Sequence, residues 1–133
     1  MGAVQERNLA AARAFYGAGA SADDAERRAF FADDFTWHVP GDTDLSVDYS
    51  GEAYFVTMPA RMAPLDEFDV RIESLAANRE LVIAVARIRG LRRGRRLDVV
   101  GGHVLRFSED ARIVEAWGWC ADQQALDAFF AEP

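Results

Sequence analysis

Few side chains in this sequence can transfer a proton near neutral pH. The chain has two histidines, His38 and His103, and one cysteine, Cys120. All fifteen basic residues are arginine, and the lack of lysine excludes Schiff-base chemistry, which needs a lysine amine. So small a set of histidine and cysteine also argues against a structural zinc site. We therefore expect no metal and no cofactor, and any catalysis to rely on imidazole, carboxylate or phenol groups.

Composition limits the partners of the chain. Its 133 residues suit a single domain spanning residues 1–133, and half of them are hydrophobic, which allows a packed core. The net charge of -7 argues against nucleic acid, whose phosphates favour a basic surface. No apolar run approaches the roughly 20 residues that a membrane helix needs, and no signal-peptide pattern opens the chain. The single cysteine indicates a reducing compartment, so we expect a cytoplasmic protein.

The spacing of apolar and turn residues predicts the elements that position these groups. An aromatic strand ends at Pro40-Gly41, and residues 41–50 read as a loop. Ser21 or Asp23 is expected to cap the second helix. The predicted helices span residues 5–17, about 23–32, 51–62 and 123–130, and the predicted strands span residues 35–39, 68–72, 81–88, 97–107 and 113–119. This order indicates an α+β fold in which a curved antiparallel sheet wraps around N-terminal helices.

Alternation along the strand 97–107 places His103 on an otherwise apolar face, which we expect to look inward. The neighbouring strands contribute small residues to the same face, which would leave room for a ligand rather than fill the interior. These small residues are Ala84, Ala86, Gly101, Ala116 and Gly118. The alternative is that large side chains fill the space from the helices and the first strand, namely Trp37, Phe55, Met58 and Met62.

Several motifs together resemble one known family. They are Ala32-Asp33-Asp34, Trp37-His38-Val39-Pro40-Gly41, Tyr49-Ser50-Gly51-Glu52, His103-Val104-Leu105-Arg106-Phe107 and Arg112-Ile113-Val114-Glu115-Ala116-Trp117. In this order the chain resembles the SnoaL-like branch of the nuclear transport factor 2 (NTF2)-like family, which includes the ketosteroid isomerases. The resemblance spans nearly the whole chain. It implies a cone-shaped fold with a pocket between the helices and the concave face of the sheet.

The resemblance also implies roles for individual residues. His103 falls where the ketosteroid isomerases have a carboxylic acid that donates a hydrogen bond to the substrate oxygen. Val39 falls at their general base, and valine cannot accept a proton. The pocket tyrosine of the family falls within one residue of Tyr16, with Phe15 as the alternative.

Parity along the first strand separates the remaining candidates. Trp37 and Val39 share one face and are expected to line the pocket, whereas His38 is expected to face the other way, unless a bulge beside Pro40 reverses this. We take His103, Tyr16 and His38 as candidate catalytic residues. Candidate substrate-binding residues are Phe15, Trp37, Val39, Phe55, Met58, Ala86, Gly101, Ala116 and Gly118.

Three functions follow as hypotheses. The first is a cofactor-independent enzyme that isomerises, cyclises or dehydrates a small apolar ring-containing metabolite, polyketide- or steroid-like, through His103 and Tyr16. The second, favoured by Val39, is a non-catalytic binding module for such a molecule. The third is epoxide hydrolysis, which needs an Asp-Arg-Asp set in the pocket. It ranks last because Arg87 and Asp98 fall on the outer face.

The outer face of the sheet carries an interaction prediction. Trp117 and Trp119 share the face opposite Ala116 and Gly118, and two exposed tryptophans are unusual on a soluble monomer. We expect a homodimer through this convex face. Elsewhere, Asp122 is expected to cap the last helix, and the arginines of residues 92–96 are expected to form a solvated hairpin tip.

Overall fold

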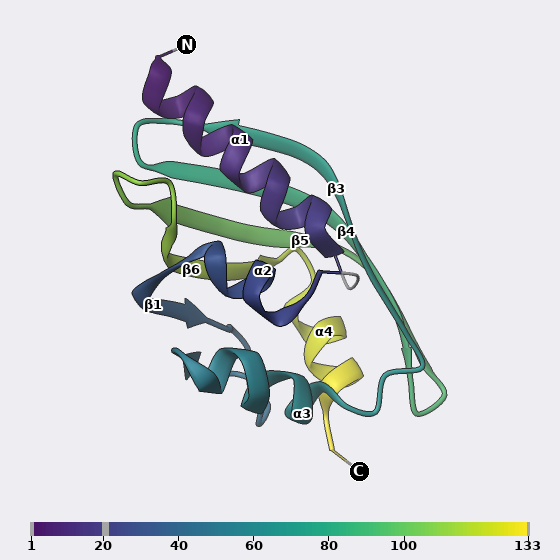
Figure 1. The fold of residues 1–133 in the computed structure, drawn as a ribbon. Coiled ribbons are helices and arrows are strands. Elements are labelled where there is room, and N and C mark those ends of the chain that lie inside the picture. Colours follow the sequence, from purple (N-terminus) through teal and green to yellow (C-terminus); the bar gives the residue numbers. More distant parts are fainter. Residues whose placement is uncertain (1, 20–21, 133) are drawn as a thin grey trace.

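The computed structural model describes residues 2–19 and 22–132 (Figure 1). The helices and the sheet form the α+β arrangement that the sequence indicates, with the helices packed against one face of a curved sheet that stays open. The helical segments are α1 (Ala3–Ala18), α2 (Asp24–Ala29), the π-helical turn η2 (Ala53–Thr57), α3 (Met58–Met62) and α4 (Gln123–Phe130). None of these helices is long and apolar enough to cross a membrane.

Six strands form one sheet in the order β2-β1-β6-β5-β4-β3. Their bounds are β1 (Phe31–His38), β2 (Asp48–Tyr49), β3 (Glu67–Ala77), β4 (Leu81–Arg92), β5 (Arg95–Phe107) and β6 (Ile113–Cys120). All neighbours are antiparallel except β1 and β6, which are parallel. The expected antiparallel sheet therefore contains one parallel pair, because the chain returns to β1 only after completing the β3–β6 meander.

The sequence analysis misplaced the start of the first strand. β1 begins at Phe31, so the residues expected to end the second helix belong to a strand instead. Phe31 pairs with Ile113, and the register then shifts before Thr36. The exposed residues Asp33 and Asp34 lie in this irregular part. Simple alternation puts Phe31, Asp33 and Phe35 on one face. The irregularity lets Asp33 stay exposed while Phe31 and Phe35 are both buried, their ring centroids 4.4 Å apart.

Capping confirms two of the predicted helix starts. The Asp23 side chain accepts a hydrogen bond from the backbone N–H of Glu26 at 2.8 Å, and Asp122 accepts one from Ala125 at 3.1 Å. The other proposed cap, Ser21, lies outside the described residues. The loop expected over residues 41–50 contains the short strand β2, which the sequence analysis missed. Two residues are too few for a recognisable alternation.

The core lies between the helices and the concave face of the sheet. α1 packs on β3 and β4, α2 packs on β1, and α4 packs on β5 and β6. Strand alternation holds as expected in β5, where Leu97, Val99, Leu105 and Phe107 are buried. Figure 1 shows the long β3–β4–β5 strands curving from α1 toward α4.

Arg92 departs from the solvated role expected for the arginines of residues 92–96. Its side chain is fully buried at the end of β4. It donates hydrogen bonds to the carbonyl oxygens of Met62, Ala63 and Phe129 and forms an ion pair with Glu132 at 2.9 Å. Arg92 thus ties the end of α3 to the C-terminal helix. The sequence analysis ended this strand at residue 88 and treated the hairpin arginines as one exposed group. β4 instead runs to Arg92, and its alternation places this residue on the inner face.

Candidate active site

The centre of the candidate site is a hydrogen bond between a helix and a strand. Tyr16, on α1, lies with its hydroxyl oxygen 2.9 Å from Nδ1 of His103, on β5. The two rings are nearly parallel, with centroids 5.9 Å apart. The sequence analysis selected these two residues from separate arguments, and the structure brings them together on the concave face.

Aromatic side chains surround this pair. The ring of Trp37, on β1, meets His103 edge-on with centroids 4.7 Å apart. Phe15 contacts both Tyr16 and Trp37, at centroid distances of 5.0 and 6.0 Å. Trp37 therefore lies inward, as parity requires, and Phe15 and Tyr16 both reach the site rather than being alternatives.

Tyr54 belongs to this group, and the sequence analysis did not select it. Its ring lies 4.9 Å from that of Trp37. It stands on η2, and π-helical turns are rare and frequently found at functional sites. The wider turn lets two successive residues, Tyr54 and Phe55, both contact Phe31, at 5.0 and 5.5 Å. An α-helical pattern gives no signal for such an arrangement. The one available clue was that Tyr54, like Tyr16, lies in a predicted helix that faces the predicted pocket.

Burial controls the protonation of the central pair. It lowers the pKa of His103 to about 4, and no charged neighbour contributes to that shift. Burial also raises the pKa of Tyr16, and electrostatic coupling to Tyr54 raises it further. Burial likewise raises the pKa of Tyr54. At neutral pH the site is therefore an uncharged imidazole bonded to the uncharged phenol of Tyr16, with the uncharged phenol of Tyr54 beyond Trp37.

A neutral imidazole has one donor and one acceptor nitrogen. When the Tyr16 hydroxyl donates to Nδ1, the proton of His103 is on Nε2. No hydrogen bond from Nε2 to another described residue is observed, and His103 keeps part of its surface exposed. The arrangement can therefore present one N–H donor to a bound oxygen atom. In the other tautomer Nε2 presents a lone pair.

The small residues of the concave face do not all leave open space. A Cβ atom added to Gly101 would lie 2.9 Å from Cδ1 of Ile88, and one added to Gly118 would lie 3.0 Å from Cδ of Pro40. These glycines permit close packing, so the argument that they mark free volume is wrong at both positions. Ala86 and Ala116 are also fully buried in the core.

The remaining predicted binding residues lie on the core side. Phe55, Met58 and Val39 are partly buried and pack against the core, and so does Met62. This is the packing that the alternative interpretation anticipated, in which large side chains fill the space from the helix side. Among the described residues, hollows of about 350 and 310 Å³ lie elsewhere, and neither is lined by His103 or Tyr16.

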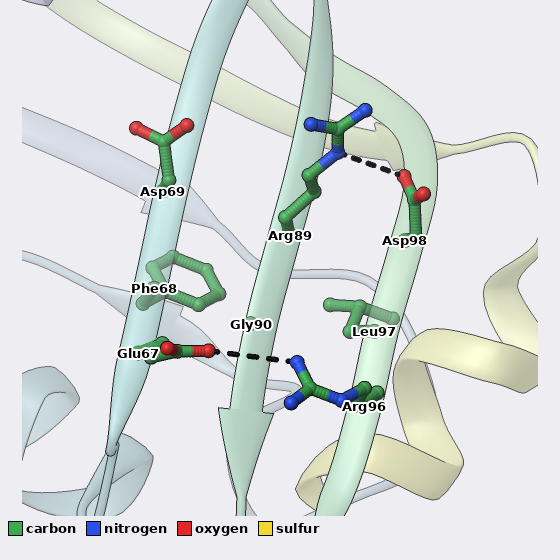
Figure 2. Close-up of a pocket in the computed structure, with 8 residues that line it drawn as sticks. All are labelled: Glu67, Phe68, Asp69, Arg89, Gly90, Arg96, Leu97 and Asp98. Carbon is green, nitrogen blue, oxygen red and sulfur yellow. Dashed lines mark hydrogen bonds and ion pairs between the residues drawn. The ribbon is translucent and has the colours of Figure 1, made fainter.

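The larger hollow is on the far part of the sheet (Figure 2). It lies beside Gly90, between the ion pairs Arg89–Asp98 at 3.4 Å and Glu67–Arg96 at 3.6 Å. Gly90 is six residues along β4 from Ala84, which pairs with His103, a separation of about 20 Å. The hollow is therefore separate from the candidate active site, and its lining carries three carboxylates and two guanidinium groups.

The structure does not bring His38 to this site. His38 lies on the convex face, where its ring stacks on Trp117 with centroids 5.7 Å apart. Its nitrogens are held by Asp48 and Glu115. Parity, which placed it away from the pocket, was the sounder argument, and we remove His38 from the candidate catalytic set.

Other ionisable groups also lie outside the site. Arg87 and Asp98 form an exposed ion pair at 2.6 Å on the outer face, away from Tyr16 and His103. No set of three or more metal-ligating side chains is found among residues 2–19 and 22–132.

A family model described as a SnoaL-like domain matches residues 12–116, a range that includes Tyr16, Trp37, Tyr54 and His103. The chain belongs to the SnoaL-like family. No curated protein matches it in sequence.

Solved structures share the fold of this SnoaL-like chain. Bal32a, from a soil-derived mobile gene cassette, is 26% identical with a TM-score of 0.83, and the match covers 95% of this chain and 98% of that one. An NTF2-like protein from Burkholderia pseudomallei is 19% identical, with a TM-score of 0.81 and coverage of 95% and 98%. A putative SnoaL-like polyketide cyclase from Jannaschia is 15% identical, with a TM-score of 0.76 and coverage of 100% and 98%. The expected NTF2-like fold is thus confirmed.

Proposed function

We propose that this SnoaL-like protein is a cofactor-independent enzyme that acts on a small, apolar, ring-containing carbonyl compound. The reaction is an isomerisation, an aldol-type cyclisation or a dehydration. The observation that carries the proposal is the hydrogen bond between Tyr16 and His103 within a wall of aromatic side chains. A flat polyketide- or steroid-like ring system suits such walls, because aromatic faces pack on flat apolar rings.

The proposed chemistry uses His103 in its neutral form. Its Nε2–H donates a hydrogen bond to the carbonyl oxygen of the substrate, while Tyr16 donates to Nδ1 and fixes this tautomer. Charge that develops on the oxygen, as the neighbouring carbon gives up its proton to a solvent water or hydroxide, is then stabilised in a site of low polarity. Enol or enolate formation of this kind is common to the three reaction types. A pKa of about 4 makes His103 a better hydrogen-bond donor to an oxyanion than a proton-abstracting base.

The test is hydrogen exchange beside the carbonyl group. Candidate ring-containing ketones are incubated with the protein in heavy water, and deuterium uptake is followed by mass spectrometry. Uptake that depends on the protein and is abolished in His103→Phe supports the proposal. His38→Phe is the matched control, because it removes the other imidazole from the opposite face of the sheet. Uptake that persists unchanged in His103→Phe contradicts the role given to His103.

A second candidate is a non-catalytic binding module of the same fold. The observation that favours it is Val39, which stands where the resembling isomerases have their general base. None of the described interactions places a carboxylate against His103 or Tyr16. This hypothesis predicts saturable binding of ring compounds, a modest change of affinity in His103→Phe, and no exchange at any ketone.

We also propose that two copies of the chain associate through the convex face of the sheet. Cross-strand pairing aligns Ile83, Val104 and Trp117 in one row. Ile83 and Trp117 are exposed by 44% and 36%. Trp119, in the next row, has a buried indole N–H with no acceptor among the described residues. The two rows are bordered by Arg106 and Glu115 on one side and by Arg87 on the other, as a polar rim borders the apolar centre of an interface.

A further inference from the structure

The side chain of His38 is held between two carboxylates. Its Nδ1 lies 2.7 Å from Oδ1 of Asp48, and its Nε2 lies 2.7 Å from Oε2 of Glu115. An ionised carboxylate only accepts hydrogen bonds, so each contact requires a proton on the imidazole nitrogen. A neutral imidazole can supply one of these protons, and the imidazolium supplies both. The geometry therefore fits the charged form of His38.

Three strands meet at this residue. His38 is the last residue of β1, Asp48 is on β2 and Glu115 is on β6. Arg106, on β5, contacts the other oxygen of Glu115 at 3.4 Å, and Trp117 stacks on the imidazole ring. Asp48, Glu115 and Arg106 are the charged groups that the described contacts place in this cluster.

β2 has few other attachments to the sheet. It consists of Asp48 and Tyr49, and its two register pairs are His38 with Asp48 and Trp37 with Tyr49. The backbone N–H of Val39 also donates to the carbonyl of Val47. A two-residue strand at the edge of a sheet gains little from its ladder. Away from the ladder, the Tyr49 side chain is buried, and Arg61 donates to the carbonyl of Asp44 and to the Tyr49 hydroxyl. The charge-assisted hydrogen bond to Asp48 is therefore one of several contacts that hold the segment, and it is the one that depends on the proton of His38.

We propose that His38 is a proton-dependent latch that holds β2 and the segment of residues 42–50 against β1. With the imidazolium present, both carboxylates are bound and β2 is joined to β6 through the His38 ring. When His38 loses its proton, one of the two hydrogen bonds is lost and two carboxylates face a neutral ring. The segment then opens more often, and opening exposes Leu45 and Tyr49, which are buried in the closed form.

The direction of the pH dependence follows from the charges. Burial, the largest single influence, lowers the pKa of His38, but the hydrogen bonds to Glu115 and Asp48 outweigh it, and the net pKa is raised. A raised pKa in the folded state means that the latch is complete below about pH 6.5, the ordinary histidine pKa. It is lost as the pH rises through the folded-state pKa. The hydrogen bond from His38 lowers the pKa of Glu115, so acid weakens the latch only where this carboxylate becomes protonated.

Hydrogen–deuterium exchange of the intact protein between pH 6 and 9 tests the latch. Protection factors for residues 42–50, corrected for the intrinsic effect of pH on exchange, are expected to fall about tenfold across this range, the size expected for loss of one charge-assisted hydrogen bond. In His38→Gln the protection is expected to be low already at pH 6 and to stay constant. Asp98→Asn is the matched control, because Asp98 is a carboxylate on the same face that pairs with arginines, and it is expected to keep the wild-type pH response.

Protection that does not change with pH in the wild type, or that falls equally in His38→Gln, would overturn the proposal. A second measurement needs no variant. The chain has only two histidines, so the ring ¹⁵N shifts separate them directly. The latch requires one histidine with both nitrogens protonated at pH 6. Two neutral histidines at that pH would rule it out.

Discussion

Trp37 and His38 are consecutive in β1, yet their side chains serve opposite faces of the sheet. Trp37 is buried and contacts His103 edge-on, whereas His38 lies among carboxylates on the convex face. Successive side chains of a strand point to opposite faces of the sheet. Two neighbouring residues of β1 therefore belong to different sites, Trp37 to the candidate active site and His38 to the candidate latch. The two histidines consequently have opposite pKa shifts, His103 downward from burial and His38 upward from its carboxylate partners.

Tyr16→Phe is expected to reduce turnover by about 10- to 100-fold and to lower the free energy of unfolding by roughly 1–3 kcal/mol. The substitution keeps the ring and its aromatic contacts but removes the hydroxyl that bonds Nδ1 of His103, and one such buried hydrogen bond corresponds to roughly 1–3 kcal/mol. The measurement is the deuterium-exchange rate on the best ketone substrate, together with the thermal midpoint. Tyr49→Phe is the matched control, because the Tyr49 hydroxyl bonds the carbonyl of Leu45, away from His103. A Tyr16→Phe protein with the wild-type rate would show that the phenol does not fix the imidazole.

His103 is expected to make the protein less stable as the pH falls. Its folded-state pKa is about 4, below the ordinary value of about 6.5, so the unfolded chain binds the proton more readily between these values. The free energy of unfolding therefore decreases as the pH falls across this window, and the loss due to His103 reaches roughly 3 kcal/mol at pH 4.

Urea denaturation at pH 7, 5.5 and 4 measures this effect. His103→Phe lacks this ionisable group. Its free energy of unfolding is therefore expected to fall less between pH 7 and pH 4 than that of the wild type. An identical pH profile for the two proteins would mean that His103 titrates normally and is not buried as the structure has it.

The sequence predicts the elements of this site well where periodicity is regular. Alternation in β5 placed His103 inward, and the family resemblance pointed to Tyr16 on the first helix. Both side chains are rigidly positioned by long elements, so a one-dimensional pattern fixes the direction in which they point.

The failures occur where the backbone departs from these periods. The register shift in β1 hid its true start, the π-helical turn hid Tyr54, and β2 is too short to show any alternation. The glycines of the concave face misled for a different reason. A missing side chain indicates either free volume or a close neighbour, and only the position of Ile88 or Pro40 distinguishes the two.

Arg92→Met is expected to destabilise the protein by about 3 kcal/mol or more. The side chain is fully buried, and its removal leaves the carbonyls of Met62, Ala63 and Phe129 without their donor. Arg93→Met is the control, because Arg93 is about one-third exposed and pairs with the same Glu132 at 3.3 Å, a contact corresponding to about 0–1 kcal/mol. Chemical denaturation of both variants makes the comparison. Equal losses would mean that the ion pair with Glu132, rather than the buried carbonyl network, carries the effect.

Trp117→Glu is expected to convert a dimer into a monomer. Trp117 ends the apolar row Ile83–Val104–Trp117 of the convex face, paired with Val104 and stacked on His38. A carboxylate that is buried in an interface without a partner costs several kcal/mol. Val56→Glu is the matched control, because Val56 is exposed by 59% on η2 rather than on the sheet. The measurement is sedimentation equilibrium at roughly 1 to 100 micromolar, the range in which a standard-size interface forms. The wild type and Val56→Glu should be dimers, and Trp117→Glu should be a monomer. A monomeric wild type across this range would contradict the proposed interface.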